Sequence, residues 1–264
     1  MDKDIRELSP KELRLLIRSG EYNKPTAGLG MGYAQANVYI LPLRYAFDFF
    51  LFTQRNPKPC PVLDVLEPGI YETNFLAPDS DIRSDVPKYN VFCKGKLTDK
   101  REDIKEIWQD DFVTFFLGCS FTFEEALLRS QIPVRHIEEG KNVPMYITNI
   151  RCRDGGIFNG PLIVTMRPIP AEKIVKAVQI TARYPSVHGS PVHIGSPQEI
   201  GIKDLSKPDF GDAVEIKSEE TPVYWACGVT PQEAVLNARP DICITHSPGH
   251  MFISDKLNEE FATS

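Results

Sequence analysis

Two short segments of the chain combine a cysteine with the start of a helix, and these residues could do chemistry. The first, Phe115 to Leu127, reads F-F-L-G-C-S-F-T-F-E-E-A-L, and the second, Val223 to Val235, reads V-Y-W-A-C-G-V-T-P-Q-E-A-V. In each, an apolar run predicts a buried strand, a small pair of residues predicts a turn, and Thr before Glu-Glu or Gln-Glu predicts a capped helix start. Free N–H groups and the helix dipole at such a turn favour an anion and lower the pKa of a thiol. The competing interpretation is a plain strand-to-helix turn whose cysteine, Cys119 or Cys227, is a small core residue.

The two segments are copies of one unit. Each continues into a strand, a histidine (His136 and His246), a glycine-bearing loop and a Met-aromatic-Ile-hydroxyl motif, so the match covers residues 115–148 and 223–254. This predicts a duplicated βαβ unit with right-handed crossovers and parallel strands, hence an α/β layered fold. Ligands in such sheets bind at the carboxyl ends of the strands, so we expect the two cysteine turns to face one cleft.

Further segments predict the elements around these copies. Ser9-Pro10-Lys11-Glu12 predicts a helix that stops near Gly20, and residues 43–54 predict an apolar helix that the following prolines end. Residues 26–42 place three glycines before two polar residues, Gln35 and Asn37, and a strand. No strand precedes these glycines and no Lys-Ser/Thr follows them, so we expect close backbone packing rather than phosphate binding.

Composition restricts the class of protein. The chain has 264 residues with 42% hydrophobic and 25% charged residues, which is typical of a soluble globular protein. A net charge of -6 argues against nucleic acid or an anionic membrane as the main partner. The first residues lack the apolar core of a signal peptide, and no apolar run is long enough to span a bilayer, so we expect a cytoplasmic protein. Its six scattered cysteines are expected to be free thiols.

Arginine and histidine side chains supply candidates for carboxylate binding and, less well, for metal binding. Arg83 is either part of a salt-bridged loop or a carboxylate anchor. His188 and His193 are five residues apart in an extended loop, and a Pro-Gly pair between His246 and His250 prevents the helix that would align them. These spacings disfavour chelation, so no cofactor is predicted and only a divalent metal is left open.

The long motifs of the chain resemble a known family. They are G-C-S-F-T-F-E-E-A-L, R-H-I-E-E-G-K-N-V-P-M-Y, V-T-M-R-P-I-P, H-G-S-P-V-H-I-G, V-Y-W-A-C-G-V-T-P-Q and T-H-S-P-G-H-M-F-I-S-D, in this order. Together they resemble the YcsI-like hydro-lyase family, which is related to the D-glutamate cyclase domain, over about residues 8–256. The resemblance implies a carbon-oxygen lyase, for example one that closes D-glutamate to 5-oxo-D-proline with loss of water. It also implies a three-layer α/β/α main domain, taken here as residues 1–150 and 222–264, with a smaller α+β insertion at 151–221.

A cyclase must bend a dianionic amino acid and help hydroxide leave. We expect the helix starts after the two cysteines to hold carboxylates and a Glu or His to move protons. A thioester route through Cys119 is a second mechanism. The predicted catalytic residues are Cys119, Ser120, Glu124, Cys227 and His246. The predicted substrate-binding residues are Arg83, Arg135, Tyr146, Arg167, His188, His193, Thr230, Gln232 and His250.

Two other functions fit the same residues. Paired cysteines on duplicated halves suit a cofactor-independent racemase or epimerase, in which Cys119 and Cys227 act on opposite faces of the substrate. A module that only binds a carboxylate metabolite would show no turnover. The expected partner in every case is a small carboxylate or amino acid, and a homo-oligomer is left open.

Overall fold

The computed structural model describes residues 4–263. The larger helices in chain order are α1 (Pro10–Arg18), α2 (Leu43–Arg55), α3 (Phe121–Arg129), α4 (Arg135–Glu138), α5 (Ile174–Ala182) and α6 (Thr230–Ala238). The strands are β1 (Tyr33–Pro42), β2 (Val62–Val65), β3 (Tyr89–Cys93), β4 (Lys96–Arg101), β5 (Phe112–Gly118), β6 (Met145–Arg151), β7 (Pro161–Pro170), β8 (His193–Ile194), β9 (Glu220–Ala226), β10 (Cys243–His246) and β11 (Phe252–Leu257).

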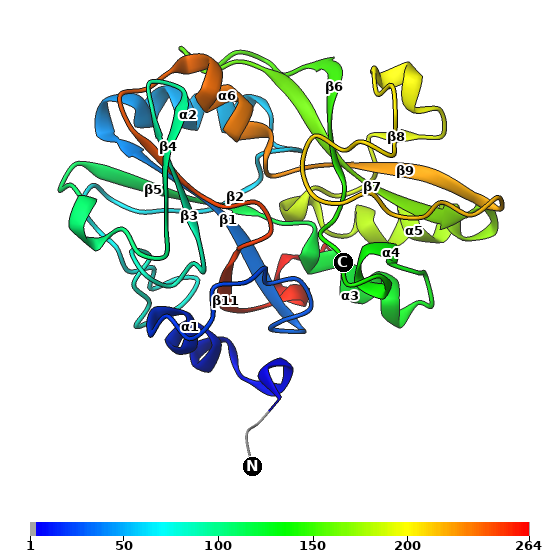
Figure 1. The fold of residues 1–264 in the computed structure, drawn as a ribbon, viewed down its shortest axis with the longest axis horizontal. Helices are drawn as coiled ribbons and strands as arrows, with labels where there is room; N and C mark the ends of the chain where they lie inside the picture. Colours follow the sequence, from blue (N-terminus) through cyan, green and yellow to red (C-terminus); the bar gives the residue numbers. More distant parts are fainter. Residues whose placement is uncertain (1–3, 264) are drawn as a thin grey trace.

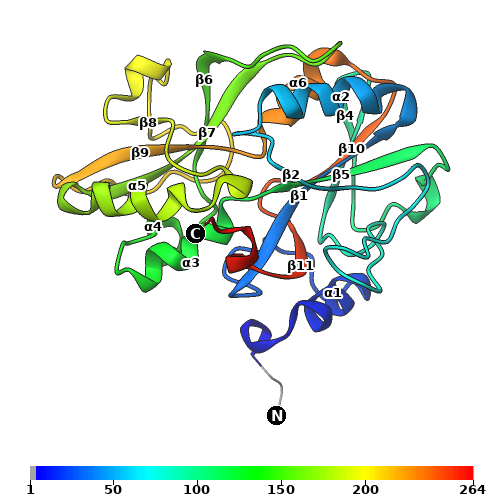
Figure 2. The same cartoon turned by 180° about the vertical axis from the view of Figure 1, so that it is seen from behind.

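The strands form two antiparallel sheets that lie side by side (Figures 1 and 2). The seven-stranded sheet has the order β2-β5-β1-β10-β3-β4, with β11 also paired to β1, and the four-stranded sheet has the order β6-β7-β9-β8. Every strand pairing within the named strands of residues 4–263 is antiparallel. The predicted three-layer α/β/α fold with parallel βαβ units is therefore wrong, and the protein is a mixed α+β fold.

The reason lies in where each copy of the repeat begins and ends. The first copy runs from β5 in the seven-stranded sheet through α3 and α4 to β6 in the four-stranded sheet, and the second runs from β9 in the four-stranded sheet through α6 and β10 to β11 in the seven-stranded sheet. The strand predicted before His136 is absent, because residues 135–138 form α4. The order strand, helix, strand is therefore present twice, but its two strands never become neighbours. Strands of the smaller sheet fall between residues 145 and 226, and the division into domains at 151 and 221 stays a prediction.

Local signals in the sequence gave correct helix boundaries at two places. Ser9 caps α1 in a capping box with Glu12, and α1 ends two residues before Gly20, which has φ +79°. Helix α2 covers the predicted apolar segment and is followed by Asn56 and its prolines. The expected caps of the repeated helices are absent: Thr122 lies inside α3, and neither α3 nor α6 has a side-chain cap hydrogen bond.

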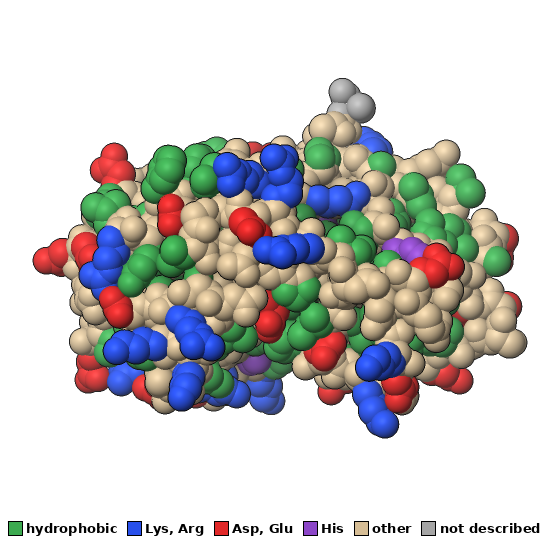
Figure 3. All heavy atoms as spheres, turned by 90° about the horizontal axis from the view of Figure 1, so that it is seen from above, with side chains coloured by type: hydrophobic (Ala, Val, Ile, Leu, Met, Phe, Trp, Pro, Cys, Tyr) green, Lys and Arg blue, Asp and Glu red, His purple; other side chains and the backbone are tan. Residues whose placement is uncertain are grey.

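One hydrophobic core contains residues of both sheets. This shared core fixes the position of the two cysteine turns, which lie between the sheets. Tyr39, Phe49 and Phe115 from β1, α2 and β5 pack in the same cluster as Val164 and Tyr224 from β7 and β9. On the face seen from above, acidic and basic side chains are intermixed with apolar ones (Figure 3). No helix among the described residues is long and apolar enough to cross a bilayer.

Candidate active site

The two cysteine turns line one pocket at the junction of the two sheets, which we call the cysteine pocket. It encloses about 320 Å³ of empty space, including its mouth. The side chains and backbone that line it come from both copies of the repeat, from β1 and from the loops before β6 and β11: Asn37, Cys119, Ser120, Phe121, Asn142, Val143, Met145, Thr165, Cys227, Gly228, Val229, His246, Gly249 and Met251. Four of the five predicted catalytic residues, Cys119, Ser120, Cys227 and His246, are therefore together.

The two thiols have equivalent surroundings. The N–H of Val229 donates a hydrogen bond to Cys227 Sγ at 3.5 Å, and the N–H of Phe121 donates to the Cys119 thiol. Burial raises the pKa of Cys119 far above its usual value and that of Cys227 to about 11, outweighing these hydrogen bonds. Both thiol pKa values are thus raised, against the lowering expected at helix starts, because the loss of water around the sulfur outweighs the helix terminus.

His246 is the histidine that lines the cysteine pocket, and one of its ring nitrogens has no hydrogen-bond partner among the described residues. It is 1% exposed; the Val38 N–H donates a hydrogen bond to its Nδ1 at 3.2 Å, and the same Nδ1 lies 3.3 Å from Val38 O. Its Nε2 has no hydrogen-bond partner among the described residues. Burial lowers the pKa of His246 to about 4, so the ring is neutral near pH 7. The ring has two neutral tautomers here: when Nδ1 accepts from the Val38 N–H, the proton is on Nε2, and when Nδ1–H donates to the Val38 carbonyl, the Nε2 lone pair can accept a proton.

Asn37 and Tyr39 on β1 hold the two cysteine turns in place. Asn37 Nδ2 donates to the Gly118 carbonyl at 2.7 Å, and Tyr39 Oη donates to the Gly228 carbonyl at 2.6 Å. Asn37 is not among the predicted site residues. Its position inside an apolar strand, where a buried amide needs hydrogen-bond partners, is the signal that could have assigned it to the site.

Replacement of Gly228 by Ala is expected to disturb this arrangement. A Cβ at this position would lie 2.1 Å from Asn37 Nδ2, so Asn37 would have to leave the Gly118 carbonyl. We expect a loss of about 1–3 kcal/mol in the free energy of unfolding, measured by urea denaturation. Gly160→Ala is the matched control for the cost of replacing a glycine, since Gly160, like Gly228, has no left-handed φ and its added Cβ would meet no atom closer than 3.3 Å. An equal or larger loss in Gly160→Ala would contradict the explanation.

A buried charge network lies behind the cysteine pocket. Arg167 is fully buried; its Nε donates to Glu124 Oε1 at 3.2 Å, and its Nη2 donates to the same oxygen and to Ser120 Oγ at 3.0 Å. Arg167 Nη1 donates to Thr165 Oγ1 at 3.0 Å, and His136 Nε2 lies 3.2 Å from Glu124 Oε1. Ser120 and Thr165 line the pocket, so Arg167 touches two of its walls while its fork binds Glu124.

The network holds Glu124 in its ionised form. Burial alone would raise the pKa of this carboxyl, but attraction to His136 and Arg167 and the hydrogen bonds from both outweigh burial and lower the pKa to about 2. A carboxylate with so low a pKa is a weak base. Glu124 instead provides a fixed negative charge that pairs with Arg167.

The low pKa of Glu124 predicts a contribution to acid stability. Because the folded-state pKa is below the usual value of 4.5, the contribution is present above pH 4.5 and is lost as pH falls towards 2. A shift of this size corresponds to about 3 kcal/mol. We expect urea unfolding of Glu124→Gln to depend less steeply on pH between 4.5 and 2 than unfolding of the unmodified chain. Parallel curves for the two proteins would show that Glu124 does not supply this dependence.

Several predicted substrate-binding residues have protein partners elsewhere. Arg83 pairs with Asp81 at 2.8 Å and lies over Tyr71, which matches the salt-bridged interpretation of this loop. Arg135 pairs with Glu220 and, at 3.1 Å, with Glu138.

Tyr146 Oη donates to the Leu205 carbonyl at 2.7 Å, and His193 Nε2 lies 2.7 Å from the Ser196 carbonyl oxygen. Like Arg83 and Arg135, these two residues do not line the cysteine pocket.

The other predicted residues lie close to the cysteine turns without lining the pocket. Thr230 Oγ1 accepts a hydrogen bond from the Ile163 N–H at 3.0 Å, and Gln232 is buried in the first turn of α6. His250 follows Gly249, a lining residue.

His188 contacts the first cysteine turn from behind. A Cβ on Gly118 would lie 2.1 Å from the Ser186 carbonyl oxygen, so the segment before His188 packs directly on this turn. His188 has φ +85°, its Nδ1 lies 2.9 Å from the Lys58 carbonyl oxygen, and its Nε2 has no hydrogen-bond partner among the described residues. Burial lowers its pKa to about 4. Such backbone strain is frequent near functional sites.

A metal centre has no set of ligands in the described part of the chain. No group of three or more His, Cys, Asp or Glu side chains within residues 4–263 is arranged to hold a metal ion. All six cysteines are free.

Comparison with known proteins identifies the family. The D-glutamate cyclase family matches residues 113–255, which contain both copies of the repeat. A protein of Bacillus licheniformis named "putative hydro-lyase" is 58% identical over 97% of this chain and 98% of its own length. A Thermoanaerobacter sp. (strain X514) protein with the same description is 60% identical over 97% of this chain and 96% of its own length. Bacillus subtilis (strain 168) hydro-lyase YcsI, described in the same way, is 56% identical over 97% of this chain and 99% of its own length.

Among solved structures, a nitrogen repressor-like protein from Methanococcus jannaschii aligns with 95% of this chain and 99% of its own. It does so at 10% identity and a TM-score of only 0.39, too low to support a conclusion. The sequence relatives are close and span the whole length of the chain. The chain therefore belongs to the YcsI-like hydro-lyase family with a D-glutamate cyclase domain, and it is a lyase.

Proposed function

We propose that the cysteine pocket binds a small amino-acid carboxylate and removes water from it, with D-glutamate closing to 5-oxo-D-proline as the reaction to test first. The observation that carries the proposal is that the unpartnered Nε2 of His246 and both cysteine turns belong to one pocket. The family match supports this choice of reaction.

The turns can supply the carboxylate contacts. No acceptor for the N–H of Ser120 or of Gly228 is found among the described residues, and both residues line the pocket. Such N–H groups at helix starts bind anions and stabilise an oxyanion. Their occurrence on two turns suits a substrate with two carboxylates.

The chemistry needs one bond to form and one to break. The amine nitrogen attacks the γ-carboxyl carbon, a C–N bond forms, and one C–O bond breaks. The two protons lost from the ammonium group leave with the departing oxygen as water. His246 Nε2 takes a proton from the nitrogen and returns it to that oxygen, which is general acid–base catalysis by a ring that is neutral at the start.

The test is incubation of the full chain with D-glutamate, L-glutamate and related amino or hydroxy diacids, followed by NMR. Loss of the amine signal and appearance of 5-oxoproline from one enantiomer is the expected result. No reaction with any of these compounds would reject the proposed substrate class.

The state of His246 predicts a pH dependence. Because the neutral ring is the reactive form and its pKa is about 4, kcat/KM should be constant from pH 7 down to about 5 and should fall below about 4. Circular dichroism at each pH separates this loss from unfolding. A fall in kcat/KM centred near the ordinary histidine pKa of about 6.5 would mean that His246 is not the group that titrates.

A racemase or epimerase is the second candidate, because two thiols line the same pocket. The raised pKa values of Cys119 and Cys227 weigh against it, since one of the pair must be a thiolate to remove a proton. Recovery of the amino acid from D₂O distinguishes the two reactions. Deuterium at Cα indicates racemisation, and ring closure without deuterium at Cα indicates the lyase.

A further inference from the structure

A second pocket lies beside the cysteine pocket, and the proposed chemistry does not use it. We call it the glycine-loop pocket; it encloses about 330 Å³ of empty space, including its mouth. It is lined by residues 28–33 together with Gln35, Phe121, Glu124, Glu125, Leu128, Ile137 and Asn258. Phe121 lines both pockets.

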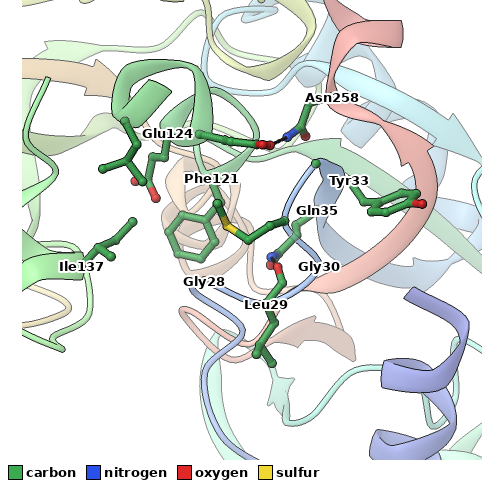
Figure 4. Close-up of a pocket in the computed structure, with 13 residues that line it drawn as sticks. Gly28, Leu29, Gly30, Tyr33, Gln35, Phe121, Glu124, Ile137 and Asn258 are labelled. Atoms are coloured by element: carbon green, nitrogen blue, oxygen red, sulfur yellow. Dashed lines mark hydrogen bonds between the residues drawn. The ribbon is translucent and has the colours of Figure 1, made fainter. Parts of the chain in front are cut away.

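Glu124 contributes a free carboxylate oxygen to the glycine-loop pocket. The residue is 3% exposed, and the hydrogen bonds from Arg167 all go to Oε1. Oε2 accepts no hydrogen bond from the described residues, and the carboxyl group points into the space between Phe121 and Ile137 (Figure 4). One oxygen thus fixes the side chain, and the other is available to a ligand.

Asn258 adds a second acceptor on the opposite wall. Its Nδ2 donates to Glu125 Oε2 at 3.1 Å, which fixes the amide, and its Oδ1 is buried without a hydrogen-bond partner among the described residues (Figure 4). Asn258 is 4% exposed. The lining residues include no Lys or Arg. The pocket therefore presents acceptor oxygens, and the arginines that pair with its two carboxylates, Arg167 with Glu124 and Arg129 with Glu125, lie outside its lining.

A compact group with several N–H donors and a positive charge fits these acceptors. An ammonium group has three rotatable donors and no acceptor. Aromatic and aliphatic carbon from Phe121, Leu128 and Ile137 can pack against the short chain that carries it. We propose that the glycine-loop pocket is a binding site for a primary ammonium ligand, with Glu124 Oε2 as its counter-ion.

The site is coupled to the cysteine pocket through hydrogen bonds. Arg167 joins Glu124 Oε1 to Ser120 and Thr165, which line the cysteine pocket. A cation bound at Oε2 weakens the attraction between Glu124 and Arg167. It therefore changes the hydrogen bonds that Arg167 donates to Ser120 and Thr165. The inference goes beyond the proposed function, because it concerns a different pocket and does not depend on the reaction.

The repeat provides a matched variant. In the alignment of the two copies, Gln232 occupies the position of Glu124 in α6 and is buried there. Glu124→Gln therefore introduces the side chain that the fold already accepts in the other copy. Glu233→Gln removes one negative charge from α6, outside the residues that line the pocket, and is the control for net charge.

The experiment is titration of the full chain with ethylammonium chloride at constant ionic strength, followed by NMR of the backbone amides, with ethanol as the uncharged probe. We expect saturable shifts in residues 28–33 and 121–128 with ethylammonium and none with ethanol. Binding should weaken at least about tenfold in Glu124→Gln, because a charge-assisted hydrogen bond is lost, and should stay within about twofold in Glu233→Gln.

Ile137→Phe gives an independent result if Glu124→Gln does not fold. It fills the space next to the carboxyl without replacing Arg167 or His136, and it should also weaken ethylammonium binding. The proposal is overturned if ethylammonium shows no saturable binding to the unmodified chain. The proposal is also overturned if ethylammonium binds with unchanged affinity to whichever of Glu124→Gln and Ile137→Phe are folded. A third contrary result is that Glu233→Gln weakens ethylammonium binding as much as Glu124→Gln does.

Discussion

Replacing His246 with Gln should lower kcat for ring closure by about a hundredfold to ten-thousandfold, the usual contribution of a positioned acid–base group. Gln retains a polar side chain of similar length but cannot exchange a proton. KM should change far less than kcat, because the N–H groups of Ser120 and Gly228 remain to bind the carboxylates. Steady-state kinetics with the substrate identified by NMR provides the measurement.

Chemical rescue separates a catalytic from a structural role for His246. In His246→Ala, added imidazole should restore part of kcat, because the missing ring leaves space beside Val38 in a pocket that already holds empty volume. The melting temperature of each variant shows whether the fold is retained. A folded His246→Gln protein with unchanged kcat would show that the proton carrier is another group.

Replacing Arg167 with Met should cost about 3–5 kcal/mol in the free energy of unfolding, because the buried Glu124 carboxylate loses its arginine partner and keeps only His136. Met has a similar length and stays apolar against Phe123 and Trp225, on which the guanidinium now lies. The loss in unfolding free energy therefore arises more from the missing positive charge than from changed packing against Phe123 and Trp225. Urea denaturation at pH 7 measures it.

The double variant Arg167→Met/Glu124→Gln is the control for this explanation. It removes both charges, so it should be more stable than Arg167→Met alone, and the difference is the cost of leaving the buried carboxylate without Arg167. A double variant as unstable as the single one would mean that Arg167 acts through packing or through its contacts with Ser120 and Thr165.

The sequence by itself determined features that depend on neighbouring residues or on direct repetition. Ser9, Pro10 and Glu12 are enough to begin α1, because a capping box is formed within one turn. The alignment of Cys119 with Cys227 predicted two equivalent turns, and both have the same sulfur-to-N–H contact. The motifs also predicted the family, which the comparisons confirm.

The tertiary structure alone decided how these parts combine. A strand, a turn and a helix have the same pattern whether the next strand joins the same sheet or another one, so the parallel α/β fold was predicted and an antiparallel α+β fold is observed. The pKa of Cys119 depends on burial by distant segments, and the partner of Arg167 is 43 residues away in the sequence. Desolvation and long-range pairing are properties of the packed chain, and local sequence patterns do not encode them.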